Sequence, residues 1–127
     1  MYDTEKCKLI FEEMRRLVPE ANLRAIKERR GGKLRFPIYI NKELMNTELE
    51  ALELSARSSH CLHRVGYHTI GELVEGIECR EDLRKIRNCG AKSVDEIMEK
   101  LFCYQYGVLP EKRKVMYIRE ILQLNGT

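Results

Sequence analysis

The stretch Ile86-Arg87-Asn88-Cys89-Gly90-Ala91-Lys92-Ser93 decides how the centre of this chain folds. An amphipathic run precedes it, and apolar residues recur after it at helical spacing, at Val94, Ile97, Met98 and Leu101. Because glycine tolerates a positive φ, Gly90 suits a tight turn between two helices. The first turn of the second helix carries backbone N–H groups without intrahelical partners, next to Lys92 and Ser93. The pattern therefore predicts a helix–hairpin–helix unit with a phosphate site at its second helix.

A weaker hairpin of the same kind lies upstream. Residues 60–65 read as a helix closed by Gly66, and Thr69 is a suitable N-cap for the next helix. Ser55 suits the cap of the helix that contains Arg57, and residues 52–54 read as an extended lead-in. The expected core is Leu62, Val65, Ile70, Leu73, Val74, Ile77, Leu83, Ile86, Val94, Ile97 and Leu101. We expect a mostly α fold, a compact helical bundle with tandem helix–hairpin–helix-like units.

The two flanks of this bundle are also expected to be helical. Apolar residues recur at spacings of three and four over residues 4–18, and a second helical pattern runs over residues 20–30 until Gly31-Gly32. Leu34–Ile40 is rich in β-branched and aromatic residues, and its proline restricts it to an edge strand or an extended segment. After Pro110 an amphipathic helix places Val115, Ile118, Ile121 and Leu122 on one side, where it can pack against the N-terminal helix.

The expected organisation has three parts. Residues 1–45 form an N-terminal helical extension, residues 46–104 form the central module, and residues 105–127 form a C-terminal amphipathic helix. A length of 127 residues with 43% hydrophobic and 34% charged residues is typical of a small folded domain with extensions. No run approaches the ~20 apolar residues that span a bilayer, and the N-terminus lacks an apolar signal core. We therefore expect a cytoplasmic protein with no membrane contact.

The five cysteines, at positions 7, 61, 79, 89 and 103, have no C-x-x-C spacing, which favours reduced and mostly buried thiols. The crowding of His60, Cys61, His63 and His68 is compatible with a metal site or with surface histidines beside a core cysteine. His60 and His63 share a helix face without evident third and fourth ligands, so we favour the second interpretation and expect no metal. No nucleophile–base pair, nucleotide loop or HExxH motif is present, so we expect no enzymatic activity and no cofactor.

Charge is divided unevenly along the chain. Residues 46–104 contain 8 basic and 11 acidic residues, whereas the segments before and after them are net basic. Nucleic-acid binding by the central module would therefore depend on a local patch rather than on bulk charge. In the N-terminal extension a basic run is either a solvated helix face or an accessory arm that contacts phosphate: Arg24, Lys27, Arg29, Arg30, Lys33 and Arg35.

From Leu52 to about Tyr104 the sequence resembles the C-terminal domain of the bacterial RNA polymerase alpha subunit. The resemblance is carried by several spaced motifs in order: Leu52-Glu53-Leu54-Ser55-Ala56-Arg57-Ser58, Cys61-Leu62, Thr69-Ile70-Gly71-Glu72-Leu73, Asn88-Cys89-Gly90-Ala91-Lys92-Ser93 and Glu96-Ile97. It implies that Arg57 is the principal DNA contact. It also implies that Asn88, Gly90, Lys92 and Ser93 hold the adjacent DNA backbone, with the Cys61 region along the same surface.

The sequence also departs from the family pattern. His60 stands where the family has an asparagine, His63 replaces a lysine, and Ala91 replaces a frequent basic residue, which weakens or removes positive charge near neutral pH. Glu53 matches an acidic position that touches sigma factor, but its acidic neighbour is Ala51 here. The ~50 residues before the module are too few for the alpha assembly domain, so the expectation is a standalone protein rather than an ordinary alpha subunit.

These observations predict a non-enzymatic bacterial DNA-binding protein that acts in transcription. Arg57 is expected to enter the minor groove of A/T-rich DNA, with His60, Cys61 and His63 along the same surface. One alternative is a protein-interaction module that mimics the polymerase domain and engages polymerase subunits or transcription factors through an acidic face. Another is the hairpin domain of a DNA-repair or recombination factor, which would prefer junctions to plain duplex DNA.

Overall fold

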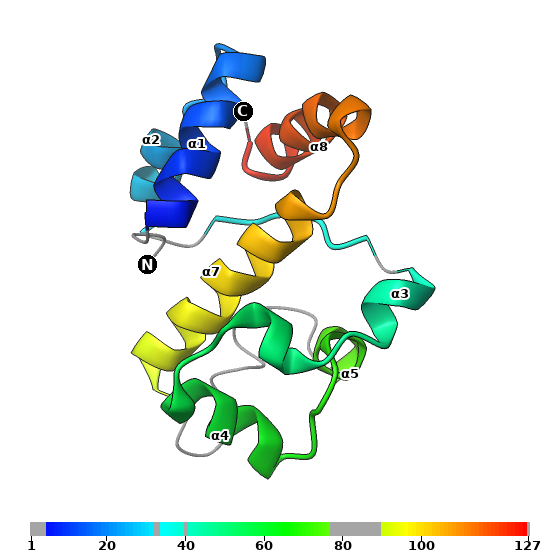
Figure 1. Cartoon of the computed structure of the whole chain (residues 1–127). Coiled ribbons are helices and arrows are strands. Elements are labelled where there is room, and N and C mark those ends of the chain that lie inside the picture. Colours follow the sequence, from blue (N-terminus) through cyan, green and yellow to red (C-terminus); the bar gives the residue numbers. More distant parts are fainter. Residues whose placement is uncertain (1–4, 32–33, 40, 77–89, 127) are drawn as a thin grey trace. The chain divides into compact units, whose positions relative to one another are not determined.

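The chain folds into two compact units in a computed structural model that describes residues 5–31, 34–39, 41–76 and 90–126. One unit combines residues 1–38 with residues 102–127, and the other comprises residues 39–101. Within the described ranges there are seven α-helices, one 3₁₀ helix and no sheet (Figure 1). The predicted mostly α fold is confirmed.

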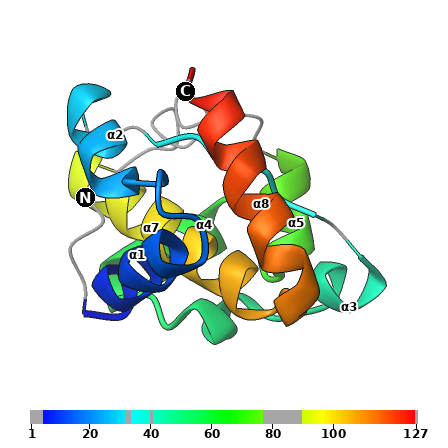
Figure 2. The same cartoon turned by 90° about the horizontal axis from the view of Figure 1, so that it is seen from above.

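The unit built from the two chain ends is a small helical assembly. Its helices are α1 (Glu5–Leu17), α2 (Leu23–Arg29), α8 (Glu111–Leu124) and the last part of α7 (Ala91–Gly107). Helix α1 contacts both α2 and α8 (Figure 2), which confirms the predicted packing of the C-terminal helix on the N-terminal one. The ring of Phe102 packs against those of Phe11 and Phe36, with centroids 5.8 and 5.3 Å away.

The segment predicted as an edge strand or extended segment carries no strand over Leu34–Tyr39. Its backbone instead forms hydrogen bonds with the side chains of Tyr117, in α8, and of Asn125, which follows α8. The amide of Asn125 accepts a bond of 3.0 Å from Arg35 N and donates one of 2.8 Å to Arg35 O. The hydroxyl of Tyr117 donates to Pro37 O at 2.9 Å. Side-chain amide and hydroxyl groups therefore take the place of a neighbouring strand.

One face of α8 differs from the prediction. The buried residues are Tyr117, Ile118, Ile121 and Leu122, whereas Val115 is 37% exposed. Tyr117 is buried because its ring lies near that of Tyr106, with centroids 6.4 Å apart, while its hydroxyl still finds a carbonyl. The periodicity of the sequence predicted that Val115 would be buried and did not identify Tyr117 as a buried residue.

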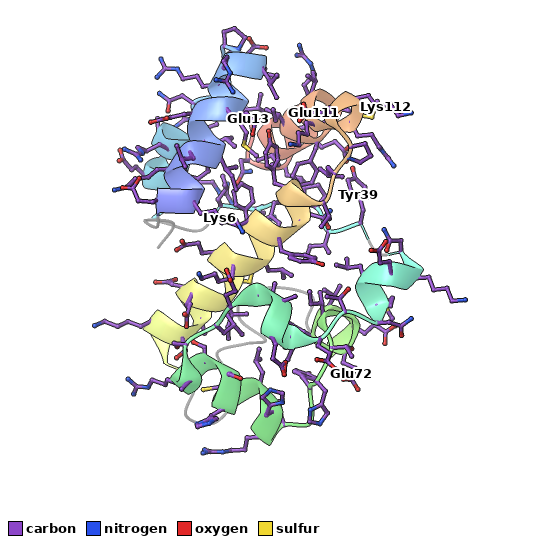
Figure 3. All side chains as sticks on the ribbon, viewed as in Figure 1. Lys6, Glu13, Tyr39, Glu72, Glu111 and Lys112 are labelled. Atoms are coloured by element: carbon purple, nitrogen blue, oxygen red, sulfur yellow. The ribbon has the colours of Figure 1, made fainter. Side chains whose placement is uncertain are left out.

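A lysine links α1 and α8 above the aromatic core. Lys114 Nζ lies 3.3 Å from Glu111 Oε1, 3.8 Å from Glu13 Oε1 and 4.7 Å from the centre of the Tyr106 ring. Both carboxylates are labelled in Figure 3. Burial of Tyr106 and the neighbouring Glu13 raise the pKa of its phenol above the usual range. Tyr106 therefore stays neutral under the lysine.

The second unit begins with two short helices, α3 (Lys42–Met45) and the 3₁₀ helix η1 (Leu49–Leu52). An isolated antiparallel bridge pairs Glu48 with Thr69, next to bonds from Leu49 N to His68 O and from Ile70 N to Thr47 O. The predicted extended lead-in over residues 52–54 is therefore corrected at Leu52, which ends a 3₁₀ turn. Glu53 follows with φ of 54°, a left-handed conformation that redirects the chain into the next helix.

The upstream hairpin was predicted correctly. Helix α4 (Ala56–Arg64) ends before Gly66, whose φ is +92°, and α5 (Ile70–Gly76) follows. Thr69 Oγ1 accepts from Glu72 N at 3.1 Å, while Glu72 Oε1 accepts from Thr69 N at 3.0 Å, which is a capping box. Glu72 is labelled in Figure 3. Hydrogen bonds from the backbone N–H groups of His68 and Thr69, and to a smaller extent the hydroxyl of Thr69, keep the pKa of Glu72 below its usual value.

Helix α5 packs closely against α3. A Cβ built on Gly71 would come within 2.5 Å of Met45 O, so only glycine fits this contact. Most of the predicted core is buried: Leu62, Ile70, Leu73, Val94, Ile97 and Leu101 are at most 1% exposed. Val65 is an error of the prediction, because it follows the last turn of α4 and is 46% exposed. Ile77, Leu83 and Ile86 lie outside the described residues.

Helix α7 belongs to both units, since residues up to Leu101 are part of the second unit and Phe102 onward part of the first. None of the helices in the described ranges has the length and apolar content needed to cross a membrane.

Candidate nucleic-acid interface

The first turn of α4 is held by a serine cap. Ser55 has an extended backbone, and its hydroxyl accepts a hydrogen bond of 3.3 Å from Ser58 N. This is the N-cap role that the sequence predicted, and it fixes where the helix begins. Arg57 consequently lies at the second helical position of α4, with its side chain exposed.

A carboxylate from α7 completes this cap. Glu96 Oε2 accepts a bond of 2.9 Å from Ser55 N, and Glu96 Oε1 accepts one of 2.7 Å from Ser55 Oγ. The hydroxyl of the buried Ser58 donates to the same Glu96 Oε1. Partial burial opposes ionisation of Glu96, but the hydrogen bonds from the two serines and the charge of Lys100 outweigh it and lower the pKa of this carboxyl. Glu96 thus joins the start of α4 to the first turns of α7.

Glu96 belongs to one of the family motifs but was not predicted as a site residue. Its partners lie 38 and 41 residues away in the chain, so no local spacing indicates the contact. A glutamate two turns into an amphipathic helix is usually a solvated charge, and only the packing of α4 on α7 brings the serines to it.

The exposed face of α4 carries a row of side chains with basic character. Arg57, His60 and Arg64 are all exposed and follow one another at spacings of three and four, which places them on one side of the helix. Arg64 was missed by the sequence analysis because it matches none of the family motifs. Cys61 is only 4% exposed, so its thiol belongs to the core.

The start of α7 supplies the second group of predicted residues. Lys92 and Gly90 are exposed, and a Cβ on Gly90 would meet none of the described atoms within 4 Å. Ser93 is only 5% exposed, so this residue is largely buried. Asn88 lies outside the described residues. Lys92 precedes Glu96 by one helical turn, so Lys92 and the capped end of α4 flank the same carboxylate.

His63 does not join the exposed row on α4. Its Nδ1 lies 3.0 Å from Nδ1 of His68, and its Nε2 lies 3.8 Å from Glu50 Oε1. This histidine is therefore turned toward the loop before α5 and toward η1. The DNA contact predicted for His60 and His63 stays a prediction.

The predicted accessory arm is distributed over α2 and the segment after it. Arg24, Arg29 and Arg35 are exposed, Arg30 is half-buried and Lys27 is only 7% exposed. Lys33 lies outside the described residues. Arg24 lines a groove of about 180 Å³ with Lys8, Arg15 and Glu12, above Phe11, Ala21, Asn22 and Leu23. The residues of the basic run thus differ in exposure and do not form one uniform face.

Residues 40–102 match the family described as the C-terminal domain of the alpha chain of bacterial RNA polymerase. The chain is 56% identical over 57 residues to the DNA-directed RNA polymerase subunit alpha of Bifidobacterium adolescentis, a match that includes 45% of this chain and 17% of the relative. The same subunit of Cutibacterium acnes is 52% identical over 59 residues, which cover 46% and 17%. That of Thermotoga maritima is 48% identical over 61 residues, which cover 48% and 18%.

No solved structure matches the chain. The chain spans less than a fifth of the length of these relatives. The similarity coincides with the compact unit of residues 39–101, which contains the capped start of α4, Glu96 and the first turns of α7. Residues 40–102 are therefore similar to the C-terminal domains of bacterial RNA polymerase alpha chains.

Proposed function

We propose that the second unit binds DNA without catalysis and acts in transcription, with Arg57 entering the narrow minor groove of A/T-rich DNA. The observation that carries this proposal is the bonding of Glu96 to Ser55 and Ser58. These hydrogen bonds hold the first turn of α4, which carries Arg57, beside the first turns of α7, which carry Lys92. The exposed guanidinium of Arg57 and the exposed ammonium of Lys92 therefore lie on either side of the same hydrogen-bonded contact between α4 and α7.

The physical basis is electrostatic. A narrow A/T-rich minor groove has a strongly negative potential that attracts an inserted guanidinium without reading individual bases. Because the module has more acidic than basic residues, binding depends on this local group of cations. Arg64 and His60 extend the row along α4, and Lys92 is positioned to contact a phosphate next to the groove.

The remaining predicted contacts have different roles in this proposal. Gly90 leaves space for close approach of a phosphate to the N-terminal turn of α7, where Ser93 lies. Asn88 keeps the role that the family resemblance implies. Cys61 supports α4 from the core, and the proposal does not depend on His63, whose ring lies near His68 and Glu50.

The test is fluorescence anisotropy with an A/T-rich and a G/C-rich duplex across a salt series. We expect salt-dependent preference for the A/T-rich duplex, and a loss of at least tenfold in affinity for Arg57→Ala. Lys92→Ala should weaken binding to both duplexes and reduce the salt slope by about one. Arg16→Ala is the matched control, because this exposed arginine lies on α1. Equal losses for Arg57→Ala and Arg16→Ala would contradict the proposal.

The accessory arm is a separate part of the same proposal. Arg24 and Arg29 are its exposed members on α2, and they would add phosphate contacts outside the groove. The double variant Arg24→Ala/Arg29→Ala should then weaken binding to both duplexes equally and leave the A/T preference unchanged. No effect on affinity would assign the basic run to a solvated helix face.

A second function is favoured by the exposed glutamates of the same unit. Glu53 is exposed at a left-handed corner, and five other exposed glutamates accompany it: Glu43, Glu48, Glu50, Glu72 and Glu75. This surface suits a basic patch on a polymerase subunit or transcription factor. Co-purification with polymerase that survives Arg57→Ala and nuclease treatment, but not Glu53→Lys, would support it over DNA binding.

A further inference from the structure

Two histidines face each other through the same ring nitrogen at the turn between α4 and α5. His63 lies in the last turn of α4, His68 lies just before α5, and their Nδ1 atoms are 3.0 Å apart. The ring centroids are 5.1 Å apart, with planes at 36°. We propose that this pair binds a divalent late transition-metal ion of the Ni²⁺ or Cu²⁺ class through the two Nδ1 atoms. The inference is independent of the proposed DNA binding.

The separation of the two nitrogens fits a particular coordination geometry. With metal–nitrogen bonds of about 2.0–2.1 Å, a gap of 3.0 Å subtends an angle of about 91–97° at the metal. This is the cis angle of square-planar or octahedral coordination, which Ni²⁺ and Cu²⁺ adopt with nitrogen and oxygen ligands. A tetrahedral Zn²⁺ ion would require the nitrogens to separate further.

The surroundings orient the His63 ring for this role. Glu50 Oε1 lies 3.8 Å from Nε2, on the side of the ring opposite the shared gap. A carboxylate there favours the tautomer with the proton on Nε2, which leaves a lone pair on Nδ1. Without metal, His68 is then the Nδ1–H donor in the pair. Metal binding requires that His68 move its ring proton to Nε2 through solvent and that both rings turn until their Nδ1 lone pairs converge on the ion, with no net change in charge on either ring.

The backbone of His68 is held in place from two sides. Its N–H donates to Glu72 Oε1 at 2.8 Å, and its carbonyl accepts from Leu49 N at 3.0 Å. His63 is held within α4. Both ligands therefore start from fixed positions, which is the preorganisation that a small site needs.

Access is open and the protein supplies only part of the coordination shell. His68 is exposed, and the His63 side chain is 32% exposed. In the described part of the chain, no third His, Cys, Asp or Glu joins the two rings in a metal-sized group. Water would complete the shell, so binding should be reversible and sensitive to the loss of either histidine.

The first test is calorimetric titration of the full chain with NiCl₂ in chelator-free buffer. We expect one equivalent of Ni²⁺ per chain, and at least tenfold weaker binding for His63→Gln and for His68→Gln. Glu50→Gln should weaken binding about tenfold through its effect on ring orientation. The matched control is His60→Gln, since His60 is an exposed histidine of the same helix and should leave the affinity unchanged.

The second test identifies the ligating atoms. In histidine-ring NMR spectra, Ni²⁺ should perturb His63 and His68 at Nδ1 and leave His60 unaffected. The proposal is overturned if the wild type binds no Ni²⁺. It is also overturned if His60→Gln weakens binding as much as His63→Gln, or if all the histidine variants bind as the wild type does. The last result would place the metal on cysteines instead.

Discussion

Removing the Glu96 carboxylate should destabilise the second unit by about 2 kcal/mol. This group accepts three hydrogen bonds, from Ser55 N, Ser55 Oγ and Ser58 Oγ. Ser55 is exposed, so water can replace the carboxylate there, and those two bonds contribute little. Ser58 is 1% exposed, and a buried hydroxyl left without its partner costs about 1–3 kcal/mol. Glu96→Gln retains one acceptor oxygen and should cost about 1 kcal/mol.

The measurement is urea unfolding followed by circular dichroism, with amide hydrogen exchange at α4 to assign the loss to this unit. A double-mutant cycle measures how much of this effect depends on the hydroxyl of Ser58. Glu96→Ala should cost less in a Ser58→Ala background, because the buried hydroxyl is no longer present. Glu75→Ala is the control, since this exposed glutamate should change the free energy of unfolding by less than about 0.5 kcal/mol. A Glu96→Ala effect as small as this control would refute the reasoning.

The pH dependence follows from the lowered pKa of Glu96. A carboxyl whose pKa is lower in the folded state stabilises the fold fully above its unfolded pKa of about 4.3, and this contribution is lost as the pH falls through the folded value. The difference in stability between wild type and Glu96→Gln should therefore be constant from pH 7 to 6 and narrow below about pH 4.5. A difference that grows in acid would contradict the assigned hydrogen bonds.

Two paired substitutions test the packing elsewhere. Gly71→Ala should cost about 1–3 kcal/mol by overpacking against α3, whereas Gly107→Ala, at the open end of α7, should be neutral or stabilising by a few tenths of a kcal/mol; urea unfolding measures both. Tyr117→Phe should cost about 0.5–1.5 kcal/mol because the bond to Pro37 O is lost. Tyr106→Phe should be neutral or stabilising, because its buried hydroxyl has no partner among the described residues. Equal effects of the two tyrosine substitutions would contradict these assignments.

Local helix signals were predicted correctly wherever a short-range hydrogen bond creates them. The Ser55 cap and the Thr69 and Glu72 capping box depend on atoms three residues apart, so the spacing of residue types is sufficient to predict them. The motifs from Leu52 onward also indicated the family correctly. In the same way, the positive φ of Gly66 follows from its place after a helix.

Other features depended on partners that are distant in the chain. Val65 has the character of a core residue but is exposed, because α4 ends before it. His63 looked like a member of the α4 surface row, yet its ring lies against His68 and Glu50, away from that face. The spacing of residue types in the sequence does not predict the direction in which a side chain near a helix end will turn.

By itself the sequence determined the helices, their caps and the family resemblance of residues 40–102, because these depend on local hydrogen bonds and on ordered motifs. Only the tertiary structure decided that Glu96 holds the start of α4, that Ser93 is buried, and that two histidines meet at Nδ1. The physical reason is that burial and long-range hydrogen bonds are properties of packed helices. A residue's chemistry limits its possible partners, but the packing of α4, α5 and α7 selects them.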